Sequence, residues 1–126
     1  MKKLLFLAIV LFNMMLHAQT EVKITSKKCI PKKGFHLQLK KVVSDSRCPE
    51  NVTCIWAGEV SAIVEVYNDK KFVEEKTITF NSKNNEENFA WFSKYYPSKV
   101  ISVEVLPYPK EGVVVKPKKQ YISVRF

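Results

Sequence analysis

Apolar and polar residues alternate along most of the chain after residue 20. The alternation is clearest at 60–67, where Val or Ala takes every second position from Val60 to Val66. This period of two is typical of a strand with one buried face. Similar patterns predict strands at 22–24, 35–40, 72–80, 101–105 and 121–126, and 113–115 is a candidate for a further short strand.

A helical period occurs at one place in this part of the chain. At 86–96, Phe89, Phe92 and Tyr96 are spaced three to four residues apart, and Pro97 ends the pattern. The segment is a candidate for one or two helical turns, with a loop as the alternative. Loop compositions separate the strands at 68–70, 81–88 and 107–109. Six to eight strands without alternating helices predict an all-β fold, a single antiparallel β-sandwich or small barrel.

The first 18 residues have the pattern of a secretory signal peptide. Lys2 and Lys3 precede an apolar run at 4–16, and Ala18 is a small residue at the expected cleavage site. The alternative is a membrane anchor, but the run is shorter than the ~20 residues that span a bilayer. We therefore expect cleavage after Ala18, export to the periplasm or medium, one domain at 19–126, and no membrane span in the mature chain.

Removal of residues 1–18 changes the formal charge from +9 to +7 and removes every methionine and His17. The remaining charge is mostly lysine, often in pairs such as Lys32–Lys33 and Lys118–Lys119. Lysines at strand ends keep sheet edges soluble, which is one interpretation. Weak binding of a polyanion such as lipopolysaccharide or an acidic polysaccharide is the other. Specific nucleic-acid recognition is not expected, because it favours arginine and the chain has only Arg47 and Arg125.

Three cysteines in an exported chain predict one disulfide and one remaining thiol. Cys48 and Cys54 enclose a short loop, and we favour this pair, which would leave Cys29 free. Pairing of Cys29 with Cys48 or with Cys54 stays open. A loop of about seven residues closed in this way stabilises the fold by roughly 2–2.5 kcal/mol.

The segment around this pair has a recognisable order: Asp-Ser-Arg-Cys-Pro at 45–49 and Cys-Ile-Trp-Ala-Gly at 54–58. It resembles a family of small exported bacterial proteins with a D-S-R-C-P…C-x-W-x-G signature. Leu-Pro-Tyr-Pro at 106–109 and the closing strand at 121–126 are similar to that family's second half. The resemblance implies an exported, β-rich domain and implies no activity.

The motif has two interpretations. In the first it is an architectural corner, in which Asp45 caps a turn or pairs with Arg47, and Trp56 covers the disulfide and the edge of the core. In the second it is a recognition loop that presents Arg47, Glu50 and Trp56 to a partner. Aromatic residues are also concentrated in the last third of the chain, and one interpretation places most of them in the core at the end of the sandwich. In the other, Trp91, Tyr95 and Tyr108 are exposed together and form a second candidate surface for a sugar or a peptide.

No enzyme or cofactor is expected. After the signal segment the one histidine is His36, which alternates with Phe35 and Leu37 and should face solvent from a strand. One histidine and three cysteines do not supply a zinc site, and there is no phosphate-binding glycine loop. Two functions are left: a non-catalytic binding module for an unknown protein or glycan of the envelope, or a passive structural component of the envelope.

Overall fold

The computed structural model describes residues 1–14, 19–27 and 29–126. The strands are β1 (Glu21–Ile24), β2 (Phe35–Asp45), β3 (Val60–Asn68), β4 (Lys71–Phe80), β5 (Ser102–Leu106) and β6 (Tyr121–Arg125). The helices are α1 (Lys2–Met14), α2 (Asn85–Ser93) and a 3-10 turn, η2 (Pro117–Lys119). All six main strand predictions are confirmed, whereas the candidate strand at 113–115 is wrong, since these residues lie in an irregular loop.

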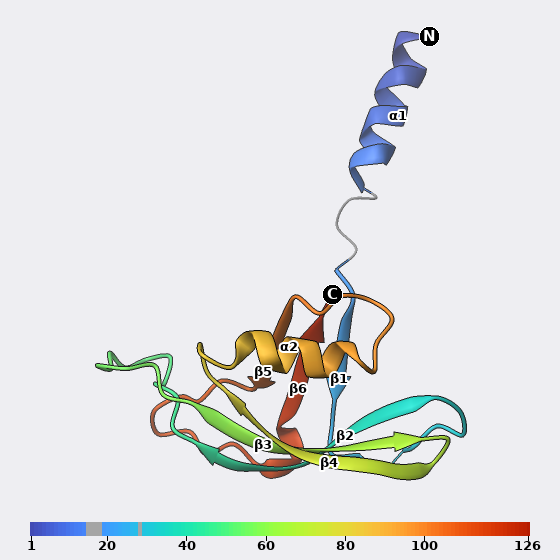
Figure 1. Cartoon of the computed structure of the whole chain (residues 1–126). Coiled ribbons are helices and arrows are strands. Elements are labelled where there is room, and N and C mark those ends of the chain that lie inside the picture. Colours follow the sequence, from blue (N-terminus) through green and yellow to red (C-terminus); the bar gives the residue numbers. More distant parts are fainter. Residues whose placement is uncertain (15–18, 28) are drawn as a thin grey trace.

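The strands form two antiparallel three-stranded sheets, in the orders β1-β6-β5 and β2-β3-β4 (Figure 1). β3 is the central strand of its sheet, with Val64 opposite Leu39 on one side and Lys76 on the other. β3 and β4 are joined at Asp69 and Lys70, both with positive φ, as a tight two-residue hairpin requires. β2 is longer than predicted, because register shifts between Leu39 and Lys41 and between Val42 and Ser44 interrupt its alternation.

Both sheets and α2 contribute to one hydrophobic core. β3 buries every second residue from Val60 to Val66, as its sequence predicts, and β6 adds Ile122 and Val124. Two aromatic residues of α2, Trp91 and Phe92, complete the core, with the Phe92 ring 6.4 Å from that of Phe80. The mostly β composition of the prediction is therefore confirmed, with the helix packed against strands of both sheets (Figure 1).

α2 confirms the helical candidate, although it ends at Ser93, four residues before Pro97. Its buried Asn88 donates a hydrogen bond of 2.9 Å from Nδ2 to the Thr79 carbonyl oxygen. This bond ties the helix to β4 and satisfies a polar side chain that would otherwise be costly to bury. The loop predicted at 81–88 therefore becomes helix in its second half.

α1 coincides with most of the apolar run near the N-terminus and lies apart from the sheets in Figure 1. In the described part of the chain, no helix combines the length and the apolar character needed to cross a membrane. Ala18, the predicted cleavage position, lies outside the described residues.

Candidate functional site

The connection between β2 and β3 extends beyond the sheet as an irregular hairpin at 46–59. Two backbone hydrogen bonds continue the pairing: Ser46 N–H to Glu59 O at 2.8 Å and Cys48 N–H to Ala57 O at 3.0 Å. The Glu59 N–H also donates to Ser46 Oγ at 3.2 Å. The Sγ atoms of Cys48 and Cys54 are at disulfide distance, 2.14 Å, which is the pairing favoured from the sequence. Cys29 is exposed and free.

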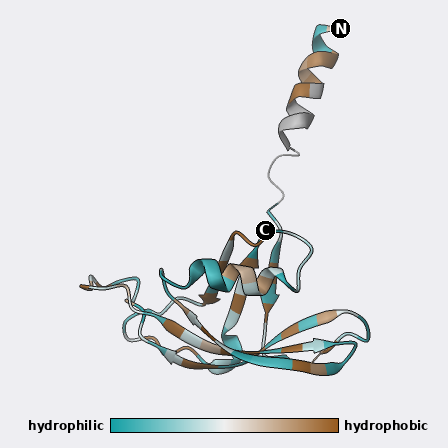
Figure 2. Ribbon diagram, viewed as in Figure 1, coloured by the Kyte–Doolittle hydropathy of each residue, from teal (hydrophilic) through white to brown (hydrophobic). Residues whose placement is uncertain are grey.

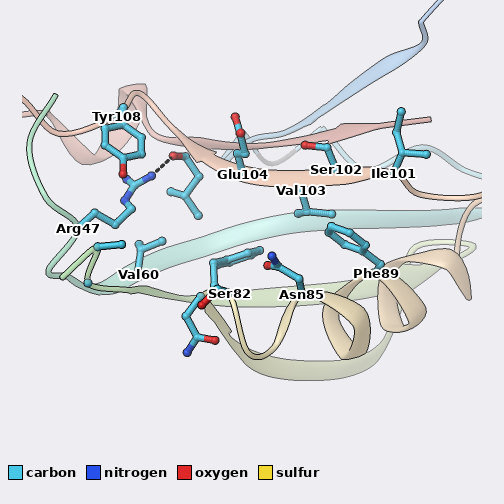
Figure 3. A pocket seen from close by; sticks show the side chains of 15 residues that line it. Arg47, Val60, Ser82, Asn85, Phe89, Ile101, Ser102, Val103, Glu104 and Tyr108 are labelled. Carbon is cyan, nitrogen blue, oxygen red and sulfur yellow. Dashed lines mark hydrogen bonds between the residues drawn. The ribbon is translucent and has the colours of Figure 1, made fainter.

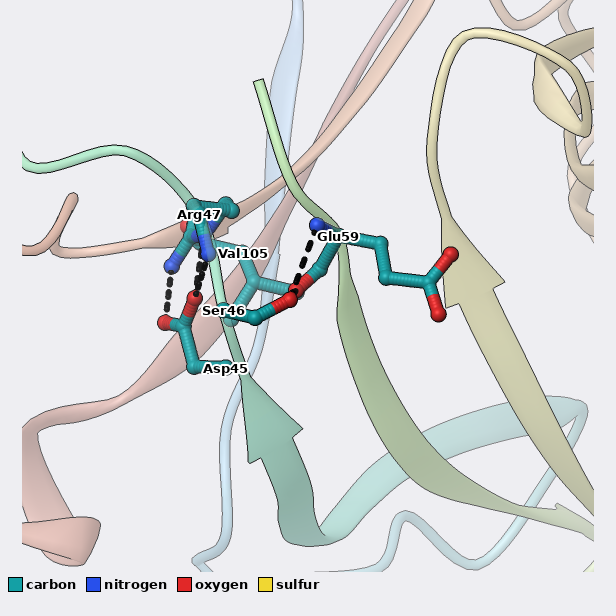
Figure 4. A network of polar contacts seen from close by, with 5 residues as sticks. All are labelled: Asp45, Ser46, Arg47, Glu59 and Val105. Atoms are coloured by element: carbon teal, nitrogen blue, oxygen red, sulfur yellow. Dashed lines mark hydrogen bonds and ion pairs between the residues drawn. The ribbon is translucent and has the colours of Figure 1, made fainter. Parts of the chain in front are cut away.

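Arg47 fastens the base of this loop to the other sheet. Its Nε and Nη2 donate to Asp45 Oδ1 and Oδ2 at 2.9 and 2.7 Å, a bidentate ion pair. Nη1 donates to the Val105 carbonyl oxygen of β5 at 2.6 Å (Figure 4). The guanidinium carbon lies 4.6 Å from the centre of the Tyr108 ring, in cation–π range. One side chain therefore connects β2, β5 and the segment that follows β5.

The prediction that Arg47 is presented to a partner is wrong. Its side chain is only 9% exposed, and its guanidinium is already engaged by Asp45 and Val105. Both roles considered for Asp45 are observed: its Oδ1 accepts the Arg47 backbone N–H at 3.2 Å, as in an Asx turn, and its carboxylate pairs with the Arg47 guanidinium. The physical reason is that an aromatic ring and a free backbone carbonyl of the neighbouring sheet lie within reach of a planar cation with several donors.

The loop also contacts the segment at 107–111. The Glu50 N–H donates to Pro109 O at 3.0 Å, and Asn51 Oδ1 accepts from the Glu111 N–H at 2.8 Å. Glu50 and Lys110 form a solvated ion pair of 3.6 Å. Glu50 is exposed, as a recognition residue would be, and the surface ion pair adds at most about 1 kcal/mol. The main effect of these contacts is to hold the Glu50–Asn51 part of the disulfide loop against the segment that follows β5.

Two apolar side chains at the end of the loop are exposed to solvent. Ile55 is 97% exposed and Trp56 is 77% exposed. The expectation that Trp56 covers the disulfide and the core edge is therefore wrong. Figure 2 shows the apolar colour reaching the tip of this projecting loop. Sequence reasoning missed Ile55, although its place between Cys54 and Trp56 in a loop was a signal, because no strand alternation assigns it a buried face.

The second predicted surface does not form as expected. Trp91 is 4% exposed and packs in the core, with its ring 5.0 Å from Phe92 and 5.3 Å from Tyr95. Including Trp91 in an interaction surface was wrong, since the inner face of α2 requires large apolar residues to reach both sheets. Tyr95 is half-buried and donates a hydrogen bond to Glu74. Burial and then this bond raise the pKa of Tyr95 to about 12. Tyr108 is partly exposed beside Arg47.

A cavity of about 300 Å³ lies between the loop base, β5 and α2 (Figure 3). Apolar walls come from Val60, Phe89 and Val103, and the polar groups are dispersed around the rim, including Ser82 and Glu104. Within residues 1–14, 19–27 and 29–126, no three His, Cys, Asp or Glu side chains gather as metal ligands. The lining residues include no His or Cys.

His36 departs from its prediction as a solvated residue. It is half-buried on β2, and its Nε2 atom is buried without a hydrogen-bond partner in the described residues. Burial lowers the pKa of His36 below its ordinary value of 6.5, because the charged imidazolium loses hydration.

This shift predicts a pH dependence of stability. The unfolded chain takes up the His36 proton at a higher pH than the folded chain does, so the free energy of unfolding falls as pH drops through about 6.5. Urea unfolding at pH 7.5, 6.5 and 5.5 should show this loss, and His36→Gln should reduce it. An unchanged pH dependence in the variant would assign the effect to other groups.

Comparisons with protein-family models, with curated proteins and with solved structures returned no match. The resemblance of the Asp45–Gly58 segment to a family of small exported proteins therefore stays a prediction, and the functional argument depends on the geometry of this chain.

Proposed function

We propose that the protein is an exported, non-catalytic binding module that holds a protein partner through Ile55 and Trp56. The supporting observation is that Ile55 is 97% and Trp56 77% exposed on a loop that is otherwise firmly held. Residues 19–126 would form the binding domain, a β-sandwich-like pair of sheets, behind a signal peptide at 1–18. Among the residues whose burial is described, the core begins at Ile24, which is consistent with this division.

Exposed side chains of this size favour contact with a partner. Covering a Trp and an Ile removes a large apolar area from water, at about 25 cal/mol per Å². Tryptophan is among the residues that most often dominate binding energy in protein interfaces. A single exposed apolar residue needs no explanation, but two adjacent ones at the tip of a projecting loop form a compact contact point.

The restraint of the loop adds to this argument. The Cys48–Cys54 bond, the Arg47 contacts to β5 and the two hydrogen bonds to segment 107–111 hold the loop before any partner arrives. Binding then requires less ordering of the chain, which improves the affinity obtained from a small contact area. A passive component of the envelope would not need an apolar tip supported in this way.

Photo-crosslinking at position 55 tests the proposal. The change is Ile55→benzoylphenylalanine, with Phe72→benzoylphenylalanine as the matched control. Phe72 is 57% exposed and lies opposite Tyr67, at the other end of β3. After export and irradiation in cells, we expect one discrete protein adduct from position 55 and none from position 72.

The same experiment separates the alternatives. A passive component gives no discrete adduct at either position. A polyanion binder also gives no adduct at position 55 and is instead retained by lipopolysaccharide in a salt-dependent manner. Either result contradicts the proposal. Intact mass of the recovered protein reports processing: we expect a chain that begins at Gln19, whereas retained Met1 contradicts export by this signal.

Trp56→Ala tests the energetic contribution of the loop. Binding of the crosslinked partner should weaken at least tenfold, since a central tryptophan typically contributes about 2 kcal/mol or more. Because Trp56 is 77% exposed, the melting temperature should hardly change. Phe72→Ala, measured by the same titration, should bind like the parent protein. Equal affinities for Trp56→Ala and the parent would remove Trp56 from the interface.

A further inference from the structure

A second cavity, of about 360 Å³, lies on the outer face of the β2-β3-β4 sheet. Val64 and Val66 of β3 point into the core, so Glu65 and Tyr67 point to the opposite face. Gln38 is opposite Glu65 in the register, and Ser26 and Ile30, which follow β1, line the same cavity. The residues that carry the argument are Ser26 and Ile30 from that segment and Gln38, Lys40, Glu65 and Tyr67 from the sheet.

Gln38 has an unmet hydrogen-bonding capacity at this cavity. The residue is 5% exposed, and its Oε1 atom has no hydrogen-bond partner in the described part of the chain. A buried amide oxygen without a donor costs stability, and such groups are rare in folded proteins. An apolar residue would fill this position at no such cost. A bound molecule that donates a hydrogen bond here explains why an amide is tolerated.

The charged groups around Gln38 are already paired with one another. Lys40 Nζ lies 2.8 Å from Glu75 Oε2 and 3.7 Å from Glu65 Oε1, and Tyr67 Oη donates to Glu65 Oε2 at 2.9 Å. The hydrogen bond and charge of Glu75 raise the pKa of Lys40, which keeps the ammonium protonated. The hydrogen bond to Glu65 raises the pKa of Tyr67.

These charges exclude two classes of ligand. The Lys40 ammonium stands between the two carboxylates, where a metal cation would need to bind. Two carboxylates against one ammonium leave a net charge of −1, which disfavours phosphate and carboxylate ligands. A neutral molecule with both donors and acceptors fits best.

We propose that this cavity binds a neutral saccharide. One hydroxyl would donate to Gln38 Oε1, and a neighbouring hydroxyl would accept from Lys40 Nζ and donate to Glu65. The Tyr67 ring and Ile30 supply apolar surface for the C–H face of a sugar. The volume is at the lower end of small-molecule sites, which suits a single sugar unit or the end of a chain.

This site is independent of the loop at 46–59. Glu65 and Tyr67 lie five and seven residues beyond Val60, where the loop joins β3. Loss of saccharide binding would leave the crosslink at position 55 unchanged, so each proposal can fail without the other.

The proposal is tested by nuclear magnetic resonance titration of the exported protein, purified from its expression host. The probes are glucose and N-acetylglucosamine, with inorganic phosphate and Ca²⁺ as separate arms. At least one sugar should produce saturable shifts centred on the Gln38 side-chain amide and Tyr67. Absence of saturation for both sugars overturns the proposal and leaves a water-filled cavity. Saturable shifts from Ca²⁺ or phosphate alone overturn it as well.

Gln38→Leu removes the amide and keeps the apolar stem. Its sugar affinity should fall at least tenfold, while its melting temperature should stay the same or rise, because an unpaired buried group is removed. Thr77→Val, an exposed change on β4 of the same sheet, is the control and should bind normally. If Gln38→Leu does not fold, Lys40→Met replaces it in the test, and its sugar affinity should also fall at least tenfold. Normal sugar affinity in either folded variant overturns the proposal.

Discussion

Arg47→Met is expected to lower the free energy of unfolding by about 3–5 kcal/mol. The substitution leaves Asp45 without its bidentate partner and the Val105 carbonyl oxygen without its donor. It also removes the cation from the Tyr108 ring. Because the Arg47 side chain is only 9% exposed, water does not readily replace these interactions. Urea unfolding monitored by circular dichroism measures the loss.

Two further variants make the test specific. Arg125→Met changes the other arginine, which is 43% exposed and lies 3.9 Å from Glu104, and should cost less than about 1 kcal/mol. Arg47→Lys retains the charge but not the planar set of donors, so its loss should lie between those of the two methionine variants. If the free energy of unfolding of Arg47→Met lies within 1 kcal/mol of that of the parent protein, the contacts to Asp45 and Val105 contribute little to joining the two sheets.

The strands could be predicted from the sequence because burial of one face imposes a simple period. β3 shows this best, since it is the central strand and Val60–Val66 alternate without a bulge. β2 could be predicted only to residue 40. Beyond it, two register shifts turn successive side chains out of phase, and these bulges depend on pairing with β3. The residues of β2 alone do not specify where this pairing shifts.

The two tryptophans show the same limit at the site. The sequence left two environments open for each: Trp56 at the core edge or presented to a partner, and Trp91 in the core or on a surface. The structure exposes Trp56 and buries Trp91. Trp91 is buried because α2 packs against both sheets, which is a tertiary contact. Trp56 is exposed because the hairpin at 46–59 continues outward past the sheet, which depends on pairing between Ser46 and Glu59. The cavity beside Gln38 could not be predicted either, because it forms only when the register of β2 against β3 places Gln38 opposite Glu65.

Gly58→Ala is expected to destabilise the protein by about 3 kcal/mol or more, because two penalties combine at one position. Gly58 has φ of +71°, where an L-residue costs about 1–2 kcal/mol. A Cβ atom there would also lie 2.7 Å from the Ser46 carbonyl carbon and 3.0 Å from the Arg47 Cα. Both are backbone atoms, so no flexible side chain can move aside. Relief requires separating the strands that Ser46–Glu59 and Cys48–Ala57 hydrogen bonds hold together.

Gly112→Ala separates the two penalties. Gly112 has φ of +74°, but a Cβ atom there meets nothing within 4 Å, so the variant should lose only the 1–2 kcal/mol of backbone strain. Equal losses for the two variants, by urea unfolding, would mean that close approach at Gly58 adds nothing. A larger loss at Gly58, with weaker crosslinking from position 55 in the folded fraction, is the expected result. The glycine then determines both the closeness of the two loop strands and the direction in which Ile55 and Trp56 project.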